Sequence, residues 1–268
     1  MIFLEEWGDA MNIINKIFWQ EDRIGMITNN LEADTHSHCM LQLFLGIEDS
    51  IEITVNEKLV KCNCIIVDKN ISHSFSARKK VYYSAIIEPT SIYAEQLTSK
   101  MNDFGYWICD NNGLEKLRQQ GTFLIDNSSK EQYLRFMEML NNYLNIPITL
   151  KHYDDRITEL LNLLRTCNCD NHTISSFADK VSLSASRLSH LFKEQIGIPL
   201  KSYILFHQME CAFRELLSGK NVTEASMTAG FDTPSHFAGT VKRMMGMPVS
   251  LSLKDSEFFE SILNILVI

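Results

Sequence analysis

The stretch Gly230-Phe231-Asp232-Thr233-Pro234-Ser235-His236-Phe237 decides the fold of the second half of this 268-residue chain. Glycine at this position permits a tight turn, and Asp232 or Thr233 can cap the helix that follows. The small residues Ala225 and Ser226 precede the turn, at the point where two short helices would cross. We therefore predict a helix-turn-helix unit here.

The segment 174–199 repeats this unit at an offset of 48 residues that grows to 49. The matched positions are Ile174 with Val222, Phe177 with Ala225, Val181 with Ala229, Leu183 with Phe231, Leu188 with Phe237, Phe192 with Val241, Lys193 with Lys242, Gly197 with Gly246 and Pro199 with Pro248. In this first copy, Val181-Ser182-Leu183 forms the predicted turn and Ser184 caps the next helix. Both copies are therefore predicted helix-turn-helix units.

A single helix joins the two units. Residues 200–218 form a predicted helix about 28 Å long, at 1.5 Å per residue. Successive major grooves on one face of DNA lie about 34 Å apart, so this helix can hold one recognition helix in each of two adjacent grooves. The exposed positions of these two helices, which can donate hydrogen bonds to bases or phosphates, are Ser186, Arg187, Ser189, His190 and Lys193 in the first and Thr233, Ser235, His236, Lys242 and Arg243 in the second.

The second unit also carries a family signature. Residues 154–254 resemble the AraC/XylS transcriptional regulators through Gly230-Phe231, Ser235-His236-Phe237, Lys242-Arg243 and Gly246-Met247-Pro248. The resemblance implies double-stranded DNA as a partner, with base contacts from Ser186, Ser189 and His190 and phosphate contacts from Lys193, Lys242 and Arg243. Relatives often carry arginine where this chain has His207, Gln208, Cys211 and Ala238-Gly239. The second unit is therefore expected to recognise DNA shape or backbone more than base sequence.

Short runs of β-branched and aromatic residues between turn formers fill residues 39–87 and predict a small antiparallel sandwich or barrel. Many of these regulators carry a cupin-type jelly roll before the DNA-binding domain. The first half of this chain resembles such a jelly roll at Thr35-His36-Ser37-His38, Gln42, Gly46 and the segments 64–67 and 71–75. The expected fold is α+β with two domains. Residues 1–148 would form a cupin-like antiparallel β barrel with a helical part over about residues 92–146, and residues 152–268 an all-α double helix-turn-helix domain.

The histidines of the first domain suggest a ligand site. His36 and His38 lie two residues apart, so their side chains share one face of a strand, and His73 can come alongside from a neighbouring strand. Three imidazoles with one open position suit Zn²⁺ or Fe²⁺. Metal-binding cupins usually carry glutamate four residues after the second histidine, where this chain has Gln42, a poor metal ligand. We therefore expect His36, His38, Gln42 and His73 to border an effector pocket without metal or cofactor, and a metal on the three histidines is the alternative.

A stripe of apolar residues marks an amphipathic helix that begins after Ser128 and that Asn145 and Pro147 end. Its members are Tyr133, Met137, Leu140 and Leu144. Such a stripe is usually core, but a helix between two domains is also a natural dimer surface. We assign these four residues to the interface of a homodimer.

Composition limits the classes of protein that fit. Lys and Arg total 25 against 33 Asp and Glu, and this net charge of −8 argues against simple nucleic-acid binding. Residues 153–254, however, carry 11 basic and 10 acidic side chains. The longest apolar run, 262–268, is well short of the roughly 20 residues of a spanning helix, and seven scattered cysteines do not suggest disulfides. We expect a cytoplasmic protein with no membrane partner.

Together these patterns predict a dimeric, sequence-specific transcription regulator rather than an enzyme. A small-molecule effector in the N-terminal barrel would control it, and RNA polymerase would be a further partner. One alternative is a metal-dependent cupin enzyme that uses His36, His38 and His73, but it leaves the duplicated units unexplained. The other is a ligand-free regulator whose first domain docks on a protein. An interior packed solid with side chains would favour docking, and a cavity would favour a small molecule.

Overall fold

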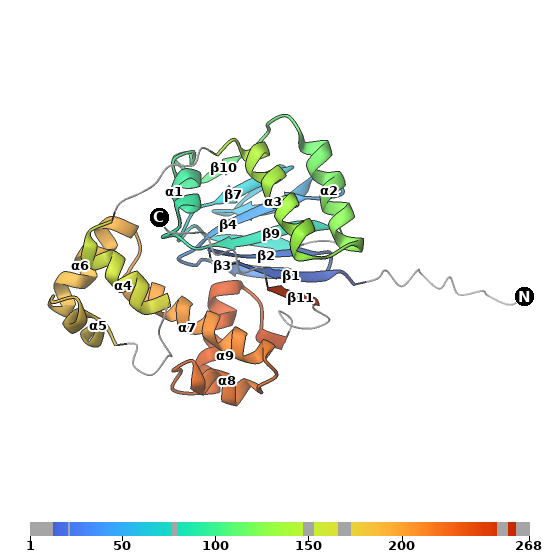
Figure 1. Ribbon diagram of the computed structural model, residues 1–268. Coiled ribbons are helices and arrows are strands. Elements are labelled where there is room, and N and C mark those ends of the chain that lie inside the picture. Colours follow the sequence, from blue (N-terminus) through green and yellow to red (C-terminus); the bar gives the residue numbers. More distant parts are fainter. Residues whose placement is uncertain are drawn as a thin grey trace, which may run out of the picture.

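Two β-sheets form the first domain (Figure 1). The computed structural model describes residues 13–20, 22–76, 80–146, 153–165, 173–250 and 257–260. The seven-stranded sheet has the order β10 (Tyr106–Ile108), β7 (Cys64–Val67), β4 (Leu41–Gly46), β9 (Tyr82–Ile87), β2 (Arg23–Thr28), β1 (Asn15–Trp19) and β11 (Glu257–Glu260). The four-stranded sheet has the order β3 (Glu32–His36), β8 (His73–Ser76), β5 (Ile51–Val55) and β6 (Lys58–Cys62).

The pairing of these strands confirms the predicted antiparallel β domain. Every neighbouring pair is antiparallel except β1 and β11, which run parallel. Within the described residues, no strand pairing closes the two sheets into a barrel. The first domain is therefore a pair of sheets.

The central strands of the seven-stranded sheet are buried on both faces, because alternate residues belong to different cores. In β9, Tyr83 and Ala85 pack with the helices α2 (Leu114–Asp126) and α3 (Lys130–Leu144). The intervening Tyr82 packs with the four-stranded sheet, and Ile86 packs with the helical second domain. The short helix α1 (Ile92–Thr98) follows β9 directly. Continuous burial of β9 thus reflects three separate partners, and it explains why this run of sequence lacks a polar face.

The predicted helix after Ser128 is confirmed, but its assignment to a dimer interface is wrong. Ser129 caps its first turn, and Asn145, at φ 49°, ends it. The stripe of Tyr133, Met137, Leu140 and Leu144 is buried in the core of the first domain. The ring of Tyr133 stacks on Phe18 at 4.2 Å between centroids, and its hydroxyl lies 3.0 Å from that of Tyr83. These side chains cover the sheet, so they are unavailable to a second copy.

In the part of the second domain that the structure describes there are six helices, which lie below and to the lower left of the sheet in Figure 1. They are α4 (Asp155–Arg165), α5 (Ile174–Lys180), α6 (Ala185–Ile196), α7 (Leu200–Leu217), α8 (Val222–Thr228) and α9 (Pro234–Met245). From the sequence we predicted that this domain extends from residue 152 to residue 268. The strand β11 instead pairs with β1 of the first domain, with Lys16 opposite Glu257, so the chain returns to the sheet after the last helix. None of the helices in the described ranges combines the length and apolar character needed to cross a bilayer.

Candidate nucleic-acid interface and interdomain pocket

The first helix-turn-helix unit consists of α5 and α6. Thr173 and Ser184 cap its two helices, each accepting a hydrogen bond from a backbone N–H of the first turn. Between the helices, Ser182 adopts a left-handed conformation at φ 56°, and the backbone N–H of Leu183 donates to Ala178 at 2.9 Å. The helix α6 ends at Gly197, which is also left-handed. The predicted turn and cap are therefore confirmed.

The second unit, α8 and α9, repeats this geometry residue by residue. Gly230, at φ 80°, stands where the first copy has Ser182, and Phe231 donates its N–H to Ser226 at 3.0 Å as Leu183 does to Ala178. Thr233 caps α9 through its hydroxyl, and Pro234 begins the helix. The internal repeat predicted from sequence thus has a physical counterpart in equivalent turns, caps and buried positions.

The helix α7 separates the two units (Figure 1). Its 18 residues span about 27 Å at 1.5 Å per residue, close to the predicted length. On α6 and α9 the predicted DNA contacts reach the surface: Ser186, Arg187, His190, Lys193, Thr233, Ser235, His236, Lys242 and Arg243 are exposed, and Ser189 is half-buried. The Ser189 hydroxyl donates to the Ala185 carbonyl at 2.8 Å, and the Thr233 hydroxyl is occupied as a cap. Both therefore act in part as local structural groups.

The end of α9 is docked on the first domain. Lys242 forms an ion pair with Asp34 of β3, and the Asp34 N–H donates to the Gly246 carbonyl at 3.2 Å. The hydrogen bond and charge of Lys242 hold the pKa of Asp34 below its usual range. A Cβ on Gly246 would lie 2.6 Å from His36 Nδ1, so glycine is required for this approach as well as for its φ of 68°. Lys242, which was predicted to contact a DNA phosphate, is thus paired with a carboxylate of the same chain.

His36, His38 and His73 come together as predicted. Residues 36 and 73 are register partners of β3 and β8, and a ring nitrogen of each histidine lies within 4.8 Å of the other two. Burial lowers the pKa of His38 to about 4 and that of His73 to about 3. Gln42 Oε1 lies 2.9 Å from Nε2 of both rings, and Gln42 Nε2 donates to Ser84 Oγ at 3.1 Å. The predicted polar cluster is therefore a single connected group.

A pocket lies between the two domains, not inside the first. Its wall is mostly apolar, and residues from the sheet, α7 and the end of α9 contribute to it: Ile17, Trp19, Ile24, Met26, Leu31, Ile86, Phe206, Met209, Phe213, Leu217, Met245 and Met247. His36, Gln42, Ser84 and Glu210 supply its polar lining. Of the predicted effector residues, His36 and Gln42 reach this wall. His38 and His73 stand behind Gln42 and contact it through hydrogen bonds.

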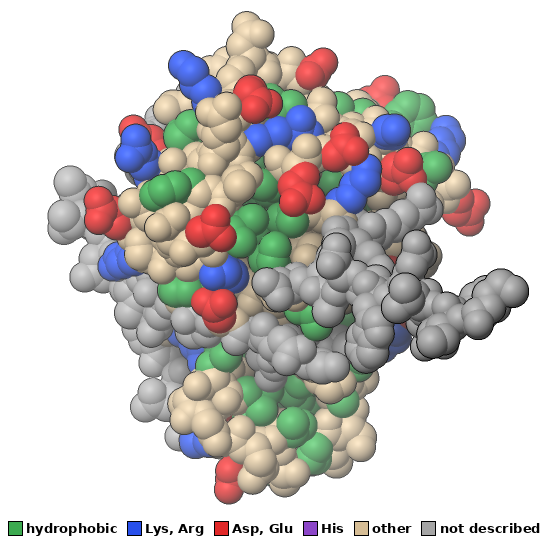
Figure 2. Space-filling view, turned by 90° about the vertical axis from the view of Figure 1, so that its right-hand side faces the viewer, with side chains coloured by type: hydrophobic (Ala, Val, Ile, Leu, Met, Phe, Trp, Pro, Cys, Tyr) green, Lys and Arg blue, Asp and Glu red, His purple; other side chains and the backbone are tan. Residues whose placement is uncertain are grey.

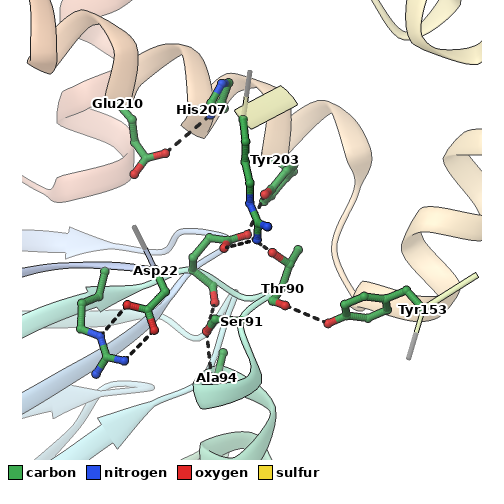
Figure 3. A network of polar contacts seen from close by, with 11 residues as sticks. Asp22, Thr90, Ser91, Ala94, Tyr153, Tyr203, His207 and Glu210 are labelled. Carbon is green, nitrogen blue, oxygen red and sulfur yellow. Dashed lines mark hydrogen bonds and ion pairs between the residues drawn. The ribbon is translucent and has the colours of Figure 1, made fainter. Parts of the chain in front are cut away.

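A second interdomain contact is built around Glu88, which follows β9. The Tyr203 hydroxyl of α7 donates to Glu88 Oε1 at 2.6 Å, and Arg165 Nη2 of α4 lies 3.6 Å from Glu88 Oε2. Figure 3 shows Tyr203 and Tyr153 reaching from the helical domain toward the segment that holds Thr90, whose carbonyl accepts from Tyr153 at 3.1 Å. Desolvation raises the pKa of Glu88 to about 7, although Arg165 and Tyr203 oppose the shift.

Asp34, Glu88 and Tyr203 were not predicted from sequence. Their contacts join residues 208 and 115 positions apart, so no local pattern identifies them. The sequence marked two of these residues only by their neighbours: Asp34 directly precedes the Thr35-His36 motif, and Glu88 directly follows a buried strand.

On the face that Figure 2 shows, surface charge is mixed rather than concentrated. Figure 2 shows Lys and Arg side chains interspersed with Asp and Glu over the upper part of one face, and few charged side chains over the lowest part, at the level of α8 and α9. On α6 and α9 the exposed cations are Arg187, Lys193, Lys242 and Arg243. A face with so few cations would release few counterions from DNA.

Comparison with known proteins also indicates a helix-turn-helix domain in the second half of the chain. Residues 177–254 match the family model of a helix-turn-helix domain. The arabinose operon regulatory protein of Escherichia coli (strain K12) is 33% identical over 123 residues, which cover 45% of this chain but only 40% of that protein. The probable transcriptional regulator LumQ of Photobacterium leiognathi is 22% identical over 228 residues, 79% of this chain and 88% of that protein.

Solved structures extend the likeness to most of the chain. A crystal structure of ToxT from Vibrio cholerae O395 covers 91% of this chain and 98% of its own, with 14% identity and a TM-score of 0.54. A structure of ToxT from Vibrio cholerae strain SCE256 with bound unsaturated fatty acid covers 91% and 95%, with 10% identity and a TM-score of 0.51. At such identities the likeness concerns the fold alone.

Proposed function

Because its double helix-turn-helix domain makes this chain a member of the AraC/XylS family of transcription regulators, we propose that it binds double-stranded DNA in a sequence-specific manner under the control of a small molecule held between its two domains. One observation carries the proposal. The pocket takes its wall from the sheet, from α7 and from the end of α9, so a ligand there contacts both the first domain and the helices that reach DNA. A ligand that fits one arrangement of the domains better than another shifts the population toward it.

The recognition helices define the DNA test. We expect His190→Ala to weaken binding to DNA upstream of the protein's own gene by about 1–3 kcal/mol and to leave binding to random DNA nearly unchanged. Lys193→Ala removes a predicted phosphate contact, so it should weaken both alike and reduce the salt dependence of the binding constant. Lys116→Ala on α2 removes the same charge from an exposed position outside the helix-turn-helix units and serves as the matched control.

Fluorescence anisotropy at low and moderate salt, with random competitor, measures all four proteins. Failure of the wild type to bind any DNA at low salt would contradict the DNA-binding proposal. If Lys116→Ala weakened binding as much as Lys193→Ala, then α6 would not be the contact surface.

The chemistry of the pocket limits the effector. Among the described residues that line it there is no Lys or Arg, and Glu210 is the one carboxyl group. A carboxylate ligand would therefore be buried without a cation, which is unfavourable, whereas an apolar neutral or cationic molecule meets no such penalty. His36, Gln42 and Ser84 can satisfy a hydroxyl or amide at one end of such a molecule. This supports an effector class different from the fatty acid held by ToxT.

Nile red, a neutral apolar dye, is a suitable probe for this pocket. We expect its emission to rise on binding and the rise to be lost in Met26→Trp, because the larger side chain fills the pocket from the sheet side. Met227→Trp, on the exposed surface of α8, makes a comparable change elsewhere. Equal dye binding by Met26→Trp and the wild type would place the apolar site outside this pocket.

We propose two protein partners: a second copy of the chain and RNA polymerase. The buried stripe of α3 is excluded from the homodimer interface, so another surface must form it. Sedimentation velocity of the full chain, with and without DNA, tests the dimer. A mass of one chain in both conditions would contradict it.

A further inference from the structure

We propose that His36, His38 and His73, with Gln42, bind a divalent transition-metal ion of the Zn²⁺, Fe²⁺, Co²⁺ or Ni²⁺ class. Among the described residues, these three histidines are the one group of three or more His, Cys, Asp or Glu side chains close enough to share an ion. The proposal is independent of the proposed function, because it concerns a site that can be loaded and measured without DNA or effector.

The three imidazole rings are oriented as histidine ligands of a metal usually are. Nδ1 of each histidine lies at hydrogen-bond distance from a backbone carbonyl: His36 from Asp34 at 2.7 Å, His38 from Met40 at 3.0 Å and His73 from Ile71 at 2.9 Å. A carbonyl oxygen only accepts, so the tautomer with the proton on Nδ1 satisfies all three contacts and leaves the lone pair of each ring on Nε2. Histidine ligands in metal sites are usually fixed in this way, with one N–H donated to a carbonyl and the other nitrogen on the ion.

The three rings also converge on one another. The ring centroids of the three pairs are 5.5, 4.4 and 5.2 Å apart, and strand pairing between β3 and β8 fixes two of the rings in register. Side chains on such rigid elements hold their positions better than side chains on loops. Three acceptor nitrogens therefore face a common volume, and a cation is the group that can bind three lone pairs at once.

Gln42 completes the group but also limits its affinity. Its Oε1 lies 2.9 Å from Nε2 of both His38 and His73. With the protons on Nδ1, this acceptor oxygen would face two lone pairs, which is unfavourable unless a cation lies between them or the amide is turned over. An ion between these atoms makes them ligands of one centre, with His36 as a further ligand. Because the amide is neutral, it neutralises none of the charge of the ion, whereas a carboxylate at this position would. Imidazole nitrogens favour Zn²⁺ and related ions over Ca²⁺ or Mg²⁺.

A metal ion can reach the three histidines, and they lie beside a contact between the two domains. His36 and Gln42 both line the interdomain pocket, which gives an ion an entry path. His36 also lies against Gly246, at the end of α9 that docks on β3. An ion on His36 would therefore lie next to the contact between the first domain and the end of α9.

The test is Co²⁺ titration of the full chain after treatment with a chelator, followed by the visible d–d absorption of bound Co²⁺ and by calorimetry. We expect one ion per chain. His73→Asn keeps an N–H that can donate to the Ile71 carbonyl but removes Nε2, so it should weaken Co²⁺ binding at least about tenfold. His190→Ala, which removes an exposed histidine of α6, is the matched control and should bind as the wild type does.

A second variant keeps the proposal testable if His73→Asn fails to fold. Gln42→Glu supplies the missing carboxylate and should tighten Co²⁺ binding at least about tenfold, with a change in the d–d spectrum. Absence of stoichiometric Co²⁺ and Zn²⁺ binding by the wild type would overturn the proposal. Unchanged affinity in His73→Asn, or unchanged affinity in Gln42→Glu, would overturn it as well, because the ion would then lie elsewhere.

Discussion

Replacement of Glu88 by glutamine removes a buried carboxyl group from the contact between the two domains. The wild-type side chain accepts from Tyr203 and Thr90 and lies opposite Arg165, while desolvation raises its pKa to about 7 from an ordinary value of 4.5. Glutamine has the same shape and can still accept from Tyr203. Arg165 is 37% exposed, so water can solvate its charge when the carboxylate is gone. The substitution therefore tests the buried charge with little change in packing.

The expected magnitude follows from the pKa shift. Because the folded state holds a proton that the unfolded chain releases, Glu88 contributes its full stability below about pH 4.5 and loses it as the pH rises toward about 7. At about 1.36 kcal/mol per pKa unit, the wild type should lose about 2.5 kcal/mol relative to Glu88→Gln between about pH 5 and about pH 8. The variant should be the more stable protein at the higher pH.

Urea denaturation at the two pH values measures this difference. Other groups that titrate, such as the buried histidines, contribute equally to both proteins and cancel in the comparison. Glu194→Gln changes an exposed carboxylate of α6 and should give no such pH-dependent difference. If the free energies of unfolding of wild type and Glu88→Gln differed by the same amount at both pH values, Glu88 would not carry the raised pKa and the reasoning would be refuted.

Three further perturbations test the packing and the docked state. Tyr133→Asp places an unpaired charge in the core of the first domain, so it should lower the free energy of unfolding by more than about 3 kcal/mol instead of breaking a dimer; thermal denaturation with sedimentation separates the two outcomes. Asp34→Ala releases Lys242 and should strengthen DNA binding, with the log–log salt slope steeper by about 1; an unaltered slope in anisotropy titrations would show that Lys242 does not reach phosphate. Gly246→Val forces a branched side chain into a left-handed position 2.6 Å from His36 Nδ1, and it should lower the melting temperature measured by calorimetry, whereas Gly239→Ala, which meets no atom within 4 Å, should not.

The local features of the DNA-binding domain could be predicted from sequence because neighbouring residues decide them. Glycine at 230 and 246 permits a left-handed backbone, and the hydroxyls of Ser184 and Thr233 cap helices through bonds that span three residues. Repetition of the same pattern 48 residues apart then predicted two units of one shape. The histidine cluster was predicted as well, but strand alternation is not its cause: β3 ends at His36, and His38 lies in the connection to β4.

Tertiary structure alone decided which surfaces these elements cover. The amphipathic stripe predicts that the face of the helix carrying Tyr133 is apolar. Whether this face packs on a sheet or on a second copy of the chain depends on the path of the chain. In this structure Tyr133 stacks on Phe18 of the sheet. The pairing of β11 with β1, the ion pair of Asp34 with Lys242 and the burial of Glu88 all join segments far apart in sequence. These contacts form only once the two domains meet, and no periodicity within either domain records them.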